Sequence, residues 1–361
     1  MLRSLTGIRF VAALAVVLFH FLYADLKGVP IIGRVVEHGY VGVTMFFVLS
    51  GFIMIYVNSR RDVRKKDFYW ARFARLYPLY LFSLIITLPF VVRGLMSEGF
   101  TPQWVAALTL TPLGLQAWVP GIFYWNSPAW SLSVEMLWYF LFPTVLPIIQ
   151  RLPERFLHLS IVSVWLIGLI APTIYQIFLP DGQPYDWETS SGWIEFIKFN
   201  PLIHLTDFLL GALVGRLFIE KIKFSYILLS LAVIIALFTL IFSQNIPYIF
   251  IHNGLLALSF GALIFWLATQ PRALRFLESS ILVHLGEASY ALYILHVPLH
   301  SYWSIFIRLL GLEEGIITNI FYVITAIFTS LLAYQFIERP AQSFLLDWRK
   351  QQHSKSTIST R

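Results

Sequence analysis

The chain has 361 residues, of which 58% are hydrophobic and only 12% are charged. Soluble domains carry about 25% charged residues, so this composition excludes a soluble globular domain and predicts a membrane protein. The sequence contains no cysteine, which excludes disulfides, cysteine–metal sites and a cysteine thioester intermediate. Basic loops on one membrane face explain the formal net charge of +7, so we expect no nucleic-acid partner.

Apolar runs bounded by charged residues, Pro and Gly predict about ten membrane-spanning helices, because each span needs about 20 apolar residues. The expected spans cover residues 5–23, 40–58, 76–93, 129–149, 157–179, 197–218, 225–243, 246–267, 284–307 and 316–337. Pro102, Pro112 and Gly114 interrupt the apolar stretch 101–118, which we expect to be interfacial or re-entrant. The predicted fold is all-α and polytopic. It has one integral membrane domain over residues 1–345 and a polar cytoplasmic tail over residues 346–361, disordered beyond Lys350.

The distribution of Lys and Arg predicts that both termini are cytoplasmic. With the N-terminus inside, twenty basic residues fall on the inner face and five on the outer face. Cytoplasmic loops of membrane proteins carry such an excess, and we interpret the loop from Arg60 to Lys66 as ordinary anchoring. A cleaved signal peptide over the first span is a less favoured alternative, because that span carries Arg9 and His20.

Two ionisable residues in the first span are predicted to lie on one helical face. Arg9 and His20 are eleven positions apart, which corresponds to about three turns and about 16 Å along a helix axis. Ionisable groups inside spans are costly and usually mark a functional interior, so we expect both residues to line one cavity. The alternative is that Arg9 reaches the inner phosphate layer and His20 the outer headgroups.

Arg72 and Arg75 follow the inner loop at a spacing that makes them neighbours on one helical face. Guanidinium groups bind phosphate well, so the two are candidates to hold a phosphorylated donor at the cytoplasmic mouth. Positive-inside anchoring explains them equally well.

Ser131, Glu135 and Tyr139 recur every four residues at the outer end of the fourth span and therefore share a face. A carboxylate within a span rarely faces lipid, and we expect Glu135 at about the depth of His20. The alternative is that Glu135 interacts with the positive end of the helix dipole.

Two later spans also carry polar residues. His204 and Asp207 can pair at three-residue spacing, and a structural role is slightly favoured for them. Ser289, Tyr293 and His296 share one face of the ninth span. Two small residues of the sixth span are expected to pack against another helix, Gly211 and Gly215.

Taken in order, these motifs resemble those of the acyltransferase-3 family of integral membrane proteins, and the resemblance covers Leu5 to about Pro340. The motifs are Arg9-x10-His20, Phe46-Phe-Val-Leu-Ser-Gly-Phe52, Arg72-Phe-Ala-Arg75-Leu-Tyr-Pro78, Trp130-Ser-Leu-Ser-Val-Glu135, Asp207-Phe-Leu-Leu-Gly211, Ser289-Tyr-Ala-Leu-Tyr293-Ile-Leu-His296 and Glu338-Arg-Pro340. Asp207 stands where the family pattern more commonly has Glu. Taken alone, the last motif predicts only that the final span stops at the inner surface.

The resemblance implies a ten-helix O-acyltransferase. Such an enzyme moves an acyl group, with acetyl expected, from cytoplasmic acyl-coenzyme A to a hydroxyl of an extracytoplasmic sugar or cell-surface polysaccharide. It also implies that Arg9 and His20 are essential. The chain ends soon after the last span, so we expect a stand-alone form without a fused SGNH hydrolase-like domain. We expect a bacterial inner membrane, acetyl-coenzyme A as co-substrate, a saccharide acceptor, and no metal or tightly bound cofactor.

The residues and the resemblance together predict a site that reaches across the membrane. Arg72 and Arg75 are expected to hold the donor's phosphates. The pantetheine arm then passes Arg9 to reach His20, the general base for the acceptor hydroxyl. Glu135 is expected to orient the imidazole, as the carboxylate does in a catalytic triad.

The acceptor and the reaction's oxyanion need hydrogen-bond donors, for which the candidates are Ser131, Tyr139, Tyr293 and His296. Trp187 and Trp193 in the outer loop could stack on a sugar, although interfacial anchoring explains them equally well. The alternative function is a transporter or flippase of a lipid-linked glycan, since polar residues and Pro-interrupted helices also line transport pathways. Many transporters have internal pseudo-symmetry, which the sequence does not show.

Overall fold

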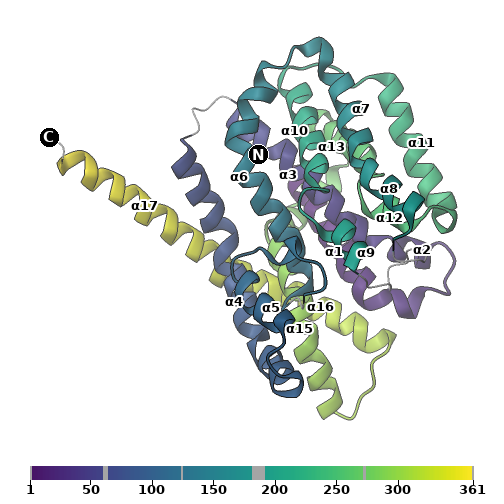
Figure 1. Cartoon of the computed structure of the whole chain (residues 1–361), viewed down its shortest axis with the longest axis vertical. Coiled ribbons are helices and arrows are strands. Elements are labelled where there is room, and N and C mark those ends of the chain that lie inside the picture. The colour runs from purple at the N-terminus through teal and green to yellow at the C-terminus, as the bar shows by residue number, and fades with distance from the viewer. Residues whose placement is uncertain (1, 60–63, 123–124, 181–191, 271–273, 360–361) are drawn as a thin grey trace.

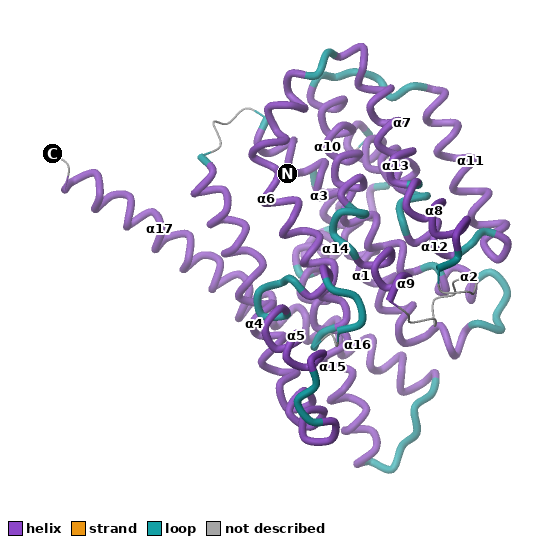
Figure 2. The backbone as a smooth tube through the Cα atoms, in the orientation of Figure 1, coloured by secondary structure: helices purple, strands orange, loops and turns teal. Residues whose placement is uncertain are grey.

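The structure is a computed structural model that describes residues 2–59, 64–122, 125–180, 192–270 and 274–359, with side chains described through residue 352. All regular structure in these segments is helical, which confirms the all-α prediction (Figure 2). The helices are α1 (Arg3–Leu26), α2 (Ile32–Glu37), α3 (Gly42–Asn58), α4 (Lys65–Glu98), α5 (Pro102–Leu110), α6 (Trp130–Arg151), α7 (Leu157–Gly168), α8 (Ile170–Phe178), α9 (Gly192–Phe199), α10 (Leu205–Ile219), α11 (Tyr226–Phe242), α12 (Tyr248–His252), α13 (Ala257–Thr269), α14 (Ser280–Glu287), α15 (Ser289–Leu309), α16 (Ile316–Ala333) and α17 (Arg339–Ser359).

Eight helical segments of the described chain are long and apolar enough to cross a membrane. They are Arg3–Leu26, Gly39–Asn58, Lys65–Glu98, Ser127–Arg151, Glu154–Phe178, Tyr226–Asn245, Tyr248–Thr269 and Ile316–Gln352. A ninth is the pair α14 and α15, which is bent by 60°. Large exposed side chains on α11 are apolar, among them Ile234, Leu237 and Ile241. Such a face needs lipid rather than water around it, so the chain is a polytopic membrane protein.

The sixth expected span, residues 197–218, is divided in the structure. α9 ends at Phe199, and α10 begins at Leu205 after a turn that contains Pro201. Proline disfavours helical backbone in the preceding residue and removes a backbone donor, so the helix breaks here. α10 has 15 residues, about 22 Å of helix, which is shorter than the ~30 Å hydrocarbon core. Within the described residues the candidate spans number eight, or nine with the bent pair, against about ten expected.

Helix α10 lies in the interior of the bundle, where it packs directly on α3. Gly211 and Gly215 face α3, and a Cβ on Gly215 would lie 2.9 Å from the carbonyl oxygen of Phe52. The predicted packing role of these two glycines is confirmed. Because α10 is buried by its neighbours and its backbone touches α3, α3 cannot slide along its axis or rotate about it.

Helix α4 begins at Lys65, eleven residues before the expected span. Arg72 and Arg75 therefore lie about 10 and 15 Å along the helix, deeper than the expected mouth. The indole of Trp70 donates to the carbonyl oxygen of Leu345 at 2.9 Å, which attaches α17 to the first turns of α4.

The predicted helix stop at Glu338-Arg339-Pro340 is wrong. A π-helical turn, Tyr334–Glu338, leads directly into α17. Pro340 directly follows this turn, in which the N–H of Arg339 bonds to the carbonyl oxygen of Tyr334, five residues earlier, and the helix continues past the proline. The chain beyond Lys350 is helical through Ser359 rather than disordered, and Figure 1 shows α17 extending away from the bundle.

The stretch 101–118 contains only the short helix α5 and a single 3-10 turn, Gln116–Trp118. It is too short to be an eleventh span, as predicted.

Candidate active site

A cavity of about 460 Å³ lies between α1, α3, α4, α6 and α15. Most of its lining is apolar. Seven of the nine predicted site residues contribute to the lining: Arg9, Arg72, Arg75, Ser131, Glu135, Tyr139 and Tyr293. The other two, His20 and His296, lie outside it. Helical spacing therefore predicted most of one site, whose residues come from four separate helices.

Local helical geometry explains how these side chains converge. Ser131, Glu135 and Tyr139 project from one face of α6 at four-residue spacing and all line the cavity. Glu135 is the sixth residue of α6, beyond the first turn where the helix dipole acts most strongly. Its place in the cavity, rather than at the helix end, favours the functional interpretation.

The cavity holds more positive than negative charge. Arg9, Arg72 and Arg75 form no ion pair with any carboxylate of the described chain. Arg9 interacts electrostatically with Arg75, a like charge, and with Glu338 and Glu135. A bound anion would relieve the repulsion between the guanidinium groups and take up their unused donors.

Arg72 is held by rings and sulfur rather than by acids. Its guanidinium lies 5.8 Å from the Phe68 ring centroid and 5.7 Å from that of Tyr139. Nη1 lies 3.6 Å from the Met54 sulfur, and the buried Nε has no hydrogen-bond partner. The aromatic contacts position the group while leaving strong hydrogen-bond donors available to a ligand.

His20 pairs with His296, not with Glu135. Nδ1 of His20 lies 2.8 Å from the carbonyl oxygen of Val16 and 3.3 Å from Nε2 of His296. The His20 side chain is exposed and that of His296 is fully buried.

Glu135 therefore does not contact His20, contrary to expectation. His20 also does not line the cavity that Arg9 lines, so the expected shared cavity is wrong. Glu135 instead interacts electrostatically with Arg75, Arg9 and Arg72. The physical reason is that three cations attract the carboxylate. The catalytic roles of these residues stay predictions.

Two neighbouring rings belong to the cavity lining, and one of them contacts the histidine pair. Phe46 and Tyr293 both line the cavity, with ring centroids 6.1 Å apart. The Tyr293 ring lies 5.8 Å from that of His296, which lies 5.0 Å from that of His20. The rings of Tyr293 and His296 thus connect the cavity lining to the ring of His20.

The four predicted acceptor-binding donors already have protein acceptors. Ser131 and Tyr293 both donate to the carbonyl oxygen of Pro128, at 3.1 and 2.9 Å. The Tyr139 hydroxyl lies 3.5 Å from the carboxylate one turn earlier on α6. His296 donates from Nδ1 to the carbonyl oxygen of Tyr293 at 2.5 Å. A role for them in binding an acceptor stays a prediction.

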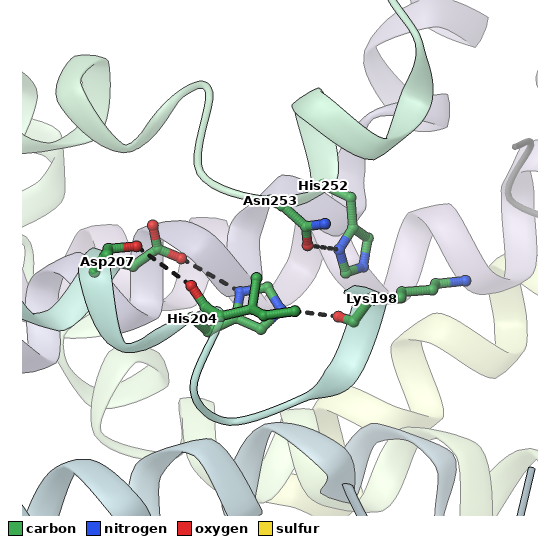
Figure 3. A network of polar contacts seen from close by, with 7 residues as sticks. Lys198, His204, Asp207, His252 and Asn253 are labelled. Carbon is green, nitrogen blue, oxygen red and sulfur yellow. Dashed lines mark hydrogen bonds and ion pairs between the residues drawn. The ribbon is translucent and has the colours of Figure 1, made fainter. Parts of the chain in front are cut away.

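A second buried polar network lies beside the start of α10, and Figure 3 shows its members Lys198, His204, Asp207, His252 and Asn253. His204 donates from Nε2 to the carbonyl oxygen of Lys198 at 2.8 Å. Its Nδ1 lies 3.4 Å from Asp207 Oδ2. Without a proton, both Nδ1 of His204 and Oδ2 of Asp207 can only accept a hydrogen bond. A hydrogen bond between them therefore requires a proton on one of the two atoms. The predicted pair is confirmed.

Sequence reasoning missed His252 and Asn253, whose side chains are 3.1 Å apart (Figure 3). They come from α12 and its C-terminal end, far along the chain from His204. No spacing rule connects them, because tertiary packing alone brings α12 beside α10. In the predicted outer loop, Trp187 lies outside the described residues, whereas Trp193 lies on α9 with 58% of its side chain exposed.

Comparison with known proteins identifies relatives over nearly the whole chain. A family model described as an acyltransferase domain matches residues 2–336. The acyltransferase MdmB of Streptomyces mycarofaciens is 30% identical, over 87% of this chain and 82% of that protein. The O-acetyltransferase OatA of Staphylococcus aureus is 25% identical over 94% of this chain and 57% of its own length.

The peptidoglycan O-acetyltransferase OatA of Listeria monocytogenes is 21% identical, over 93% of this chain and 55% of that protein. This chain therefore spans little more than half the length of the two OatA proteins. No solved structure matches it.

Proposed function

Because this chain belongs to the acyltransferase-3 family and is a membrane O-acyltransferase, we propose that it transfers an acetyl group from cytoplasmic acetyl-coenzyme A to a hydroxyl of an extracytoplasmic saccharide. The observation that carries this proposal is the cavity with three arginines and no ion-paired acid. Relatives named as O-acetyltransferases support acetyl as the acyl group. The Listeria relative, named for peptidoglycan, supports a saccharide acceptor. We propose the bacterial inner (plasma) membrane as the location of this chain.

Arg72, Arg75 and Arg9 hold the donor in this proposal. Coenzyme A carries several phosphate charges, and guanidinium groups bind phosphate through paired N–H donors. The apolar remainder of the cavity suits the pantetheine arm and the acetyl group. To deliver the thioester carbonyl to the acceptor side, the donor must pass the rings of Phe46 and Tyr293.

His20 performs the proton transfer. Its imidazole takes the proton of the acceptor hydroxyl while that oxygen attacks the thioester carbonyl carbon. The carbon–sulfur bond then breaks, and the coenzyme A thiolate takes the proton from the imidazolium. The products are an acetyl ester and free coenzyme A, and His20 returns to its starting state.

The test is transfer in sealed vesicles that hold the protein in one known orientation. Acetyl-coenzyme A is placed on the face that bears the α4 N-terminus, and a saccharide acceptor on the other. We expect acetyl ester and free coenzyme A to form in this arrangement only. Efficient transfer with both substrates on the α4 face, and none across the membrane, would overturn the proposed sidedness. Absence of coenzyme A release in every arrangement would overturn the proposed donor.

A further inference from the structure

The contacts around His20 determine which of its ring nitrogens carries the proton. Nδ1 lies 2.8 Å from the carbonyl oxygen of Val16. A carbonyl oxygen can only accept a hydrogen bond, so Nδ1 must be the protonated nitrogen. In neutral His20 the unprotonated nitrogen is then Nε2. This atom makes no hydrogen bond to any described residue, and the side chain is exposed.

The same reasoning determines the state of His296. Its Nδ1 lies 2.5 Å from the carbonyl oxygen of Tyr293, so Nδ1 is protonated and Nε2 is a bare acceptor. That Nε2 lies 3.3 Å from Nδ1 of His20. The Nδ1–H group of His20 is therefore shared between the carbonyl oxygen of Val16 and the His296 ring.

From this geometry we infer that His296 is a positioning residue: it accepts from His20 Nδ1 and thereby keeps Nε2 of His20 unprotonated and facing the acceptor side. The inference rests on the proposed function of His20 as general base. When Nε2 takes a proton, the bond from Nδ1 to His296 becomes charge-assisted and roughly twice as strong. The neutral imidazole of His296 thus orients the base and stabilises its protonated form, as the carboxylate does in a catalytic triad.

His296 is held in place by a helix irregularity two residues further on. Pro298 lacks the N–H that would bond to the carbonyl oxygen of Ile294, four residues earlier. The side chain of Asn126 supplies the missing donor, with Nδ2 at 2.7 Å from that oxygen. Tyr322 donates to the carbonyl oxygen of His296 itself. Both carbonyl oxygens therefore accept from side chains of other segments, which hold α15 in place at this point.

The His296 ring is also packed on several sides. It is completely buried, with ring centroids at 5.0 Å from His20, 5.9 Å from Phe21 and 5.8 Å from Tyr293. A buried ring with its Nδ1 bonded within its own helix has one orientation. Its acceptor therefore stays directed at His20.

The kinetic test compares His296→Leu with His296→Gln. Leu fills similar space without an acceptor, whereas the Gln side-chain oxygen can reach the place of Nε2. We expect His296→Leu to lower kcat about 10- to 100-fold, as for loss of a hydrogen bond to a charged group, with the donor KM unchanged. His296→Gln should recover most of kcat. His300→Gln, one turn along α15 and without contact to His20, is the control and should match the parent.

A second readout needs no enzymatic activity. In protein labelled with ¹⁵N-histidine, the nitrogen shifts report which ring atoms carry protons, and His20→Gln identifies the His20 signals. We expect His20 to be protonated at Nδ1 in the parent and in His296→Gln. In His296→Leu only the carbonyl oxygen of Val16 still accepts from Nδ1, so the fraction of His20 protonated at Nε2 should rise above that of the parent. A parent protonated at Nε2 would overturn the inference, as would folded His296→Gln with no more activity than His296→Leu. If the parent released no coenzyme A, the proposed function would fail while the tautomer result stood.

Discussion

Gly51 of α3 and Gly211 of α10 bring two helix backbones into direct contact. A Cβ on Gly51 would overlap the carbonyl oxygen of Phe208, and a Cβ on Gly211 would overlap that of Val48. α3 also supplies Phe46 to the cavity lining. The close approach of these two glycines therefore fixes where one wall of the site stands.

Gly211→Ala should destabilise the protein, because the obstruction is backbone and cannot rotate away. Overpacking a close-packed interior costs about 1–3 kcal/mol, which should appear as a lower Tm in detergent. Gly28→Ala is the matched control, since a Cβ there meets nothing within 4 Å. Equal Tm values for the two variants would show that α3 and α10 can separate without cost.

Replacing Arg72 and Arg75 together with Ala should weaken coenzyme A binding about 10- to 100-fold, as expected for lost hydrogen bonds to charged groups. The difference should be larger at low salt, where charge contacts are least screened. Calorimetric titration of the purified protein measures it. Lys66→Ala, an exposed cation on the same helix, should bind like the parent. Unchanged affinity in the double variant would return both arginines to the anchoring interpretation.

His20→Ala should abolish acetyl transfer and leave coenzyme A affinity within about twofold, because His20 does not line the cavity and contributes no hydrogen bond to a ligand there. Measuring turnover and binding on one preparation separates the two effects. His38→Ala is a close structural control, since Nδ1 of His38 also lies near a carbonyl oxygen four residues earlier, at 2.7 Å. Turnover in His20→Ala would remove this residue from the mechanism.

Phe46→Ala should raise the hydrolysis of acetyl-coenzyme A in the absence of acceptor. Phe46 lines the cavity beside Tyr293, and removing its ring should give water a path to the thioester. Release of free thiol measures the rate, and Phe328→Ala, on an exposed part of α16, is the control. The increase should disappear in Phe46→Ala combined with His20→Ala. Hydrolysis equal to that of the parent would mean that these rings do not separate the cavity from the outside.

Periodicity predicted what lies on one helix, and it predicted little of what lies between helices. The four-residue spacing of Ser131, Glu135 and Tyr139 correctly placed them on one face. The partner of Glu135 was wrong, because depth along a helix does not determine which neighbour a side chain faces. The carboxylate turned out to face cations on α1 and α4.

Helix ends were the other source of error. Charged residues near Lys65 were interpreted as a loop, yet a helix that projects past the membrane tolerates charges in its first turns, as α4 does. At the other end of the chain, Glu338-Arg339-Pro340 contains a helix breaker that a π-helical turn accommodates. Pro201, in the turn before α10, does break the helix. It divides an apolar run that composition alone predicted to be one continuous span.

The bond from Asn126 to Ile294 has a consequence for evolution and for coupling. The amide of Asn126 donates to the carbonyl oxygen that Pro298 leaves without a backbone donor, so the two positions depend on each other although they lie on separate segments. Their substitutions should be non-additive, as for residues that share one hydrogen bond. The segment before α6 and the helix that bears His296 thus form one cooperative unit. A ligand that displaces Asn126 on the first segment will shift His296 on the second, and through His296 it will affect His20.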